Sequence, residues 1–228
     1  MDKNTSIKSS RLLAVEGKDE CNFFKALLKI LGIETVDLRQ IASPLVGLSN
    51  DVQLVDIGGI SKFHNEFSNL YNLDGFNKVN VIGFIRDAEK NPPMSAFDSI
   101  CEILKKFNMP IPRELGIICK TGRPYTAIFV MPDNAGTGML ENLCLKTIES
   151  NPSYGCVIKY VECFSQHQNK KEEKKFNEPK SKVQAYLASR SPIVNSLGLG
   201  ALNAYWNFHH VCLNEIKEFL KSLFPKFE

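Results

Sequence analysis

The stretch VIGFIRDAEKNPP, residues 81–93, joins an apolar segment directly to a run of charge. Four of its first five residues are apolar, which is typical of a central strand in a parallel sheet that is covered on both faces. Two acids, Asp87 and Glu89, follow one residue apart. They could simply end the strand, since Asp is a common turn residue. Alternatively, they mark a metal site at the carboxyl edge of the sheet, where open α/β folds bind ligands.

Strand-like and helix-like segments alternate around this stretch through about two-thirds of the chain. This alternation predicts an α/β fold with a mostly parallel central sheet flanked by helices. We expect a core at 8–150 and a mainly helical C-terminal extension at 151–228 that packs on it, because no Gly/Ser/Pro-rich linker divides them. Strands are expected at 11–15, 51–57, 77–87, 115–119 and 125–133, helices at 19–32, 60–72, 95–108, 137–150, 181–190 and 213–224, and a turn at 197–202.

The composition is that of a soluble protein with a core, since 43% of the 228 residues are hydrophobic and 23% are charged. No apolar run is long enough to span a bilayer, and the polar start MDKNTSIKSS lacks the apolar part of a secretory signal. The seven cysteines lack paired short spacings, which favours reduced thiols. We therefore expect a cytoplasmic protein with no membrane partner.

The net charge of +3 gives no global signal for nucleic acid. Charge is concentrated between residues 159 and 190, where eight basic residues stand against four acidic ones. A mixed run of this kind is typical of a solvated surface, which is the interpretation that we favour. The alternative is a patch that contacts a phosphate backbone.

Acidic residues stand at the ends of three predicted strands: Glu16 at the first, Asp87 with Glu89 at the third, and Asp133 at the fifth. Glu141 lies in the first turns of the next helix. Parallel strands place these acids at one edge of the sheet. Two unit charges about 4 Å apart repel by about 4 kcal/mol at an effective dielectric constant near 20. A bound Mg²⁺ would offset this repulsion with hard oxygen ligands. Each acid could instead cap the helix that follows it, but three strand ends favour a shared metal.

Three segments together resemble the TOPRIM fold of topoisomerases, primases and OLD-type nucleases: LLAVEGKDE at 12–20, the pair Gly58-Gly59, and FIRDAE at 84–89. That fold carries a Glu after its first strand and an Asp-x-Asp after its third. The segments 129–143, 178–190 and 219–224 resemble a family of small stand-alone bacterial proteins that are similar to OLD nucleases. The resemblance covers nearly the whole chain.

The resemblance implies a nuclease that depends on Mg²⁺ or Mn²⁺, acts on DNA or RNA phosphodiesters, and serves phage defence or DNA repair. Glu16 and Asp87 would be catalytic and would bind metal together with Glu89, and Asp133 and Glu141 would be further metal ligands. Glu89 departs from the family pattern, which has Asp there, and its side chain is one methylene longer. The chain lacks the Gly-Lys-Ser/Thr of a P-loop, so an ATPase partner would be a separate chain.

Lysines are the expected contacts to nucleic acid. Pro179 suits the first position of a helix, which places Lys180 and Lys182 in its first turn, where a helix N-terminus and two cations would form an anion site. The alternative is that both lysines are simply solvated. Lys18 is the third expected nucleic-acid contact, and Lys182 is also expected to be catalytic.

Two other functions stay open. A non-catalytic TOPRIM-shaped binding or regulatory subunit is favoured by Glu89 and by the low net charge. A receiver-like phosphoacceptor domain ranks last, because it requires a pair of acids after the first strand and the chain offers only Glu16 before Gly17.

Overall fold

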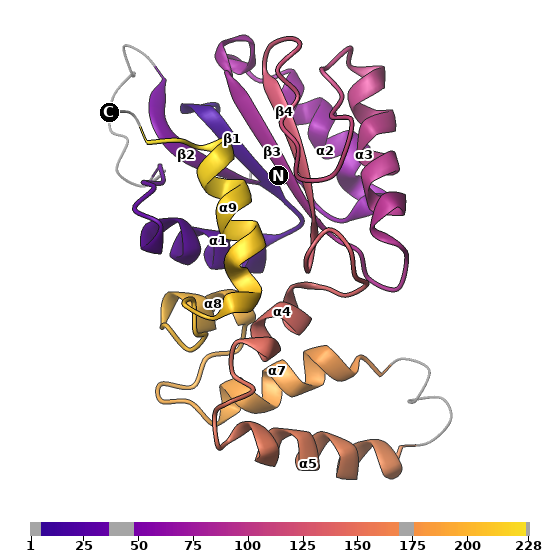
Figure 1. The fold of residues 1–228 in the computed structure, drawn as a ribbon, viewed down its shortest axis with the longest axis vertical. Helices are drawn as coiled ribbons and strands as arrows, with labels where there is room; N and C mark the ends of the chain where they lie inside the picture. The colour runs from indigo at the N-terminus through magenta and orange to yellow at the C-terminus, as the bar shows by residue number, and fades with distance from the viewer. Residues whose placement is uncertain (1–5, 37–47, 169–175, 227–228) are drawn as a thin grey trace.

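Four parallel strands in the order β2-β1-β3-β4 form the central sheet of the computed structural model, which describes residues 6–36, 48–168 and 176–226 (Figure 1). The strands are β1 (Ser9–Val15), β2 (Ser49–Asp56), β3 (Val81–Asp87) and β4 (Tyr125–Met131). The predicted fold class, an α/β protein with a parallel sheet flanked by helices, is confirmed.

Helices cover both faces of the sheet (Figure 1). On one face lie α2 (Ile60–Tyr71) and α3 (Pro93–Lys106), with the short 3₁₀ turn η1 (Phe76–Lys78) between α2 and β3. On the other face lie α1 (Lys18–Ile30) and α9 (Asn214–Leu223). Each face therefore has its own hydrophobic core.

The two cores follow from the alternation of side chains along each strand. In β3, Val81 and Ile85 belong to the core under α1 and α9, whereas Ile82 and Phe84 belong to the core under α2 and α3. Both sets are almost fully buried, which explains the nearly continuous apolar run in the sequence. The same alternation sends Arg86 and Asp87, the last two residues of β3, to opposite faces.

The C-terminal part of the chain contributes to the core under α1. After α4 (Leu140–Lys146), the helices α5 (Tyr154–Gln166) and α7 (Glu178–Ala188) lie side by side beyond the carboxyl edge of the sheet (Figure 1). The helix α8 (Leu197–Leu202) packs on α1, and the 3₁₀ turn η2 (Val211–Leu213) leads into α9. One cluster of buried residues joins these segments to the sheet.

Two predicted elements are wrong. Residues 197–202, predicted as a turn, form helix α8, which Ser196 caps by accepting a hydrogen bond from the backbone N–H of Leu199. Its Gly198 permits close packing, because a Cβ there would lie 2.6 Å from the carbonyl oxygen of Asp19 on α1. Residues 115–119, predicted as a strand, form only an isolated bridge between Cys119 and Thr126.

No helix in the described part of the chain is both long and apolar enough to cross a membrane. All seven cysteines are free thiols. Burial raises the pKa of the Cys21 thiol to about 12 and that of Cys144 well above its usual range. These thiols therefore stay protonated at neutral pH and are poor nucleophiles.

Gly83 in β3 lets α9 approach the sheet closely. A Cβ at this position would lie 2.4 Å from Cδ2 of Leu223 and 3.1 Å from Cδ1 of Leu13. We predict that Gly83→Ala lowers the free energy of unfolding by about 1–3 kcal/mol, because α9 must shift outward. Urea denaturation would measure the change.

Gly155→Ala provides the matched control, because no atom lies within 4 Å of a Cβ built at that exposed helical position. We expect it to be neutral or to stabilise by up to about 1 kcal/mol. In the double variant Gly83→Ala with Leu223→Val, the loss should be smaller than the sum of the two single losses. Strict additivity would contradict the contact between Gly83 and Leu223.

Candidate metal and nucleic-acid site

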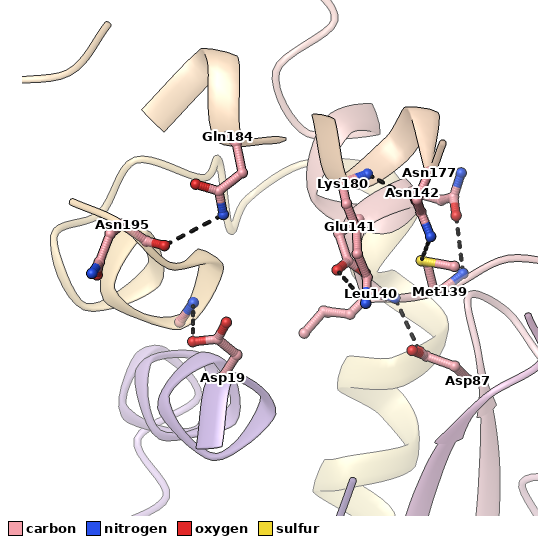
Figure 2. Close-up of polar contacts among 11 residues, drawn as sticks. Asp19, Asp87, Met139, Leu140, Glu141, Asn142, Asn177, Lys180, Gln184 and Asn195 are labelled. Carbon is pink, nitrogen blue, oxygen red and sulfur yellow. Dashed lines mark hydrogen bonds and ion pairs between the residues drawn. The ribbon is translucent and has the colours of Figure 1, made fainter. Parts of the chain in front are cut away.

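Asp87, the last residue of β3, lies at the centre of an acidic site that also comprises Glu16, Glu20 and Glu141. Its Oδ1 accepts a hydrogen bond of 3.0 Å from the backbone N–H of Leu140, the first residue of α4 (Figure 2). Burial raises the pKa of the Asp87 carboxyl well above its usual range, and the charges of Glu16, Glu141 and Glu20 raise it further. The bond from Leu140 opposes this rise but is the smallest contribution. Ionised Asp87 is therefore costly in the native protein.

Glu16 follows β1 and is held in an ion pair. Its Oε1 accepts hydrogen bonds from Nε of Arg86, at 2.8 Å, and from the backbone N–H of Asp87, at 3.2 Å. Arg86 is buried, and its Nη1 has no hydrogen-bond partner among the described residues. Its guanidinium carbon lies 5.9 Å from the centre of the Phe63 ring on α2. The charge of Glu16 is thus balanced from within the protein.

Glu20, in the first turn of α1, is a fourth acid of the site that was not predicted from the sequence. Burial raises the pKa of its carboxyl to about 7, and the charges of Glu16, Glu141 and Asp19 contribute to this rise. Gly17 leaves space for it, because a Cβ there would lie 2.9 Å from Oε2 of Glu20. The sequence did contain a signal for Glu20. It lies four residues after Glu16, and this spacing places it about one helical turn beyond the end of the strand.

Glu141, in the first turn of α4, completes the group and faces a lysine. Its Oε1 lies 3.8 Å from Nζ of Lys180 (Figure 2), and the side chain of Lys180 is 61% exposed against 17% for Glu141. A cavity of about 400 Å³ opens beside them. It is lined by Lys18, Asp19, Glu20, Leu140, Glu141, Lys180 and Leu197. Two of the three predicted nucleic-acid lysines therefore lie at the acidic site.

Three other predicted residues have different surroundings. Glu89 is exposed, has a positive φ of 54°, and is not among the acids that shift the pKa of Asp87. Asp133 accepts backbone hydrogen bonds from Gly136, at 2.7 Å, and from Ala135, and thereby shapes its own loop. The Nζ of Lys182 pairs with Glu178 at 2.6 Å. Their expected ligand or catalytic roles stay predictions.

The basic run that precedes α7 lies mostly outside the described residues. Lys170, Lys171, Lys174 and Lys175 all belong to the range 169–175. Whether that run is solvated or contacts phosphate stays a prediction.

The donor chemistry of the acidic group suits a hard divalent cation, because it offers only carboxylate oxygens, and burial disfavours the ionised forms of Asp87 and Glu20. Within the ranges that the structure describes, no group of three or more His, Cys, Asp or Glu side chains is arranged so that it could hold a metal ion. Metal binding at this group would therefore require its side chains to turn toward one another. Glu16 is the most restrained of them, because it is paired with Arg86.

The fold and this site together define a parallel α/β protein with an acidic centre at the carboxyl edge of its sheet. Residues 10–225 match the family described as "Protein of unknown function (DUF3226)", and the chain belongs to this family. A comparison with curated proteins gives no match.

Among solved structures, the chain is similar to the C-terminal region of the Xanthomonas campestris pv. campestris OLD protein. The structure phased with iodine has 12% identity and a TM-score of 0.45, with 95% of this chain and 96% of that chain covered. The structure phased with mercury has 10% identity and a TM-score of 0.44 over the same shares.

The raised pKa of Glu20 predicts that stability falls as pH rises. The carboxyl titrates at 4.5 when unperturbed and at about 7 in the native protein. Native Glu20 therefore holds its proton more tightly between these values, and the free energy of unfolding decreases from about pH 4.5 to about pH 7. The contribution of Glu20 to this decrease is up to about 3 kcal/mol. Urea denaturation across this range would measure it.

Glu20→Gln should flatten this pH dependence and raise stability above pH 7. Some dependence should persist, because the pKa of Asp87 is raised in the same direction. Glu89→Gln is the matched control and should leave the profile unchanged. If the Glu20→Gln and wild-type profiles run parallel, Glu20 does not belong to the acidic group.

Proposed function

We propose that this protein binds a divalent cation, Mg²⁺ or Mn²⁺, at the acidic site and acts on phosphodiesters of DNA or RNA. The observation that carries this proposal is the convergence of Glu16, Glu20, Asp87 and Glu141, whose charges raise the pKa of Asp87 or Glu20. Three segments of the chain, the β1–α1 junction, the end of β3 and the start of α4, supply these acids. A divalent cation would offset their mutual repulsion.

The residues of this chain would divide the work as follows. Asp87, Glu20 and Glu141 would hold the ion, and Arg86 would keep Glu16 oriented through its Nε contact of 2.8 Å. The backbone N–H of Leu140 would fix one oxygen of Asp87. A divalent ion supplies Lewis acidity toward a phosphoryl oxygen and lowers the pKa of bound water.

Nucleic acid is proposed as the substrate because the motifs around Glu16 and Asp87 resemble the TOPRIM pattern. Lys18 and Lys180 support this, because both line the cavity beside the acids and could contact phosphate oxygens. We extend the proposal to an ATPase partner on another chain, as the resemblance to OLD nucleases implies.

A second candidate is a non-catalytic binding or regulatory subunit. It is favoured because two acids of the site already pair with basic side chains of the protein itself: Glu16 pairs with Arg86, and Glu141 pairs with Lys180. The side chains described here also form no ready metal-ligand group. In this case the acids would shape the surface without metal chemistry.

Divalent cation should raise the melting temperature of the wild-type protein, because it binds the native state only. Asp87→Asn should remove most of this gain while raising stability without metal, because it removes a buried charge that the neighbouring acids disfavour. Differential scanning calorimetry with Mg²⁺, Mn²⁺ and EDTA would measure both effects.

Glu20→Gln and Glu89→Gln form a matched pair for this experiment. The same substitution should weaken the response to metal at Glu20, within the acidic group, and leave it unchanged at exposed Glu89. A response lost in Glu89→Gln and kept in Glu20→Gln would restore the sequence-based assignment of Glu89 as a ligand. Identical responses in Asp87→Asn and the wild type would exclude this metal site.

Lys180 should contribute more to nucleic-acid binding than Lys182, because Lys180 is 61% exposed at the cavity and Lys182 is engaged by Glu178. We predict that Lys180→Ala weakens binding and reduces the slope of log K against log salt by about one unit. Lys182→Ala is the control and should leave the slope unchanged. Fluorescence anisotropy across a salt series would measure it, and the reverse ranking would reinstate Lys182 as the contact.

A further inference from the structure

A second pocket, of about 200 Å³, lies at the amino edge of the sheet, opposite the acidic site. The starts of all four strands contribute to its lining, with Arg11 from β1, Asn50 from β2, Val81 from β3 and Tyr125 from β4. The end of α9 closes one side with Leu223. The pocket is thus formed by the sheet together with the C-terminal helix.

All charged residues that line this pocket in the described part of the chain are basic. Arg11, Lys120 and Arg123 line it, and no Asp or Glu does so among the described residues. Arg11 mainly stabilises the wall of the pocket, because its guanidinium donates hydrogen bonds to the carbonyl oxygens of Asn50 and Pro225, at 3.0 Å each. The cations available to a ligand are therefore Lys120 and Arg123.

No acidic residue in the described part of the chain pairs with either of these two cations. Lys120 and Arg123 are both exposed, and neither forms an ion pair in the described part of the chain. Arg123 donates a hydrogen bond of 2.7 Å to Oδ1 of Asn80 and lies 4.7 Å from the centre of the Tyr125 ring. Both partners are uncharged, so they orient the guanidinium without cancelling its charge. An oriented guanidinium is suited to a phosphate or carboxylate group.

The remaining lining has two kinds of surface. Asn50 and Asn80 add amide groups, and Val81, Ile118 and Leu223 add an apolar wall. An inorganic anion would use the cations and amides only. A molecule that combines a phosphate with a ring would also use the apolar wall, whose burial adds to affinity.

We propose that this pocket binds a phosphate monoester of a small ring-containing molecule, with a mononucleotide as the model ligand. Arg123 and Lys120 would contact the phosphate, and the apolar wall would contact the ring. The proposal is independent of the acidic site, which lies at the other edge of the sheet.

Isothermal titration calorimetry on the full chain in EDTA would test this proposal, because the chelator prevents any metal-dependent binding. The probes are a nucleoside 5′-monophosphate, the corresponding nucleoside and inorganic phosphate. We expect saturable binding of the monophosphate, weaker binding of inorganic phosphate and none of the nucleoside. Arg123→Gln should weaken binding of the monophosphate about tenfold. Arg123→Lys, which keeps the positive charge, should lose less affinity for the monophosphate than Arg123→Gln.

Arg113→Gln is the matched control, because Arg113 is exposed and lies outside the pocket. It should bind the monophosphate as the wild type does. Circular dichroism would establish that each variant folds. Absence of saturable binding to the wild type, or equal losses in Arg123→Gln and Arg113→Gln, would overturn the proposal. Tighter binding of an oligonucleotide with hydroxyl ends, lost in Arg123→Gln, would also overturn it and assign the pocket to nucleic acid.

Discussion

The ion pair between Arg86 and Glu16 fixes the relative positions of the strand ends that carry the acidic site. One oxygen of Glu16 accepts from Arg86 and also from the backbone N–H of Asp87, so the ends of β1 and β3 are tied together. Arg86 is buried against Phe63, and removal of either partner would leave an uncompensated charge. The pair therefore holds Glu16 on the α2 side while Asp87 faces α4.

The sheet separates charge between its two edges. Acids gather at the carboxyl edge, where burial and mutual repulsion disfavour the ionised forms of Asp87 and Glu20. Cations gather at the amino edge around Arg123 and Lys120. The low net charge of +3 conceals this arrangement, because opposite charges at distant sites cancel in the sum. The two edges of the sheet thus present surfaces of opposite charge.

The sequence predicted the fold class well, because the alternation of apolar strands and helices is strong. It predicted that Glu16, Asp87, Glu89, Asp133 and Glu141 lie at one edge, since parallel strands end at a common edge. Of these, Glu16 and Glu141 shift the pKa of Asp87, whereas Glu89 and Asp133 do not. Glu20 was missed because its proximity to Glu16 and Glu141 arises only in the folded chain. The exposure of Glu89 depends on a left-handed backbone that the sequence does not signal. Helix α8 was missed because its glycines disfavour a helix until α1 packs against Gly198 and until Leu187 and Trp206 pack against Gly200.

The close fit of Leu223 against Gly83 sets an order of events during synthesis. The ribosome completes β4 at Met131 long before it reaches α9, so the sheet area over Gly83 has no cover throughout that interval. The neighbouring apolar residues Val81 and Ile85 then face solvent on that side. Nascent chains with exposed strands of this kind are aggregation-prone and are typical clients of chaperones. The core under α1 and α9, and the cationic pocket that α9 helps to line, therefore form last.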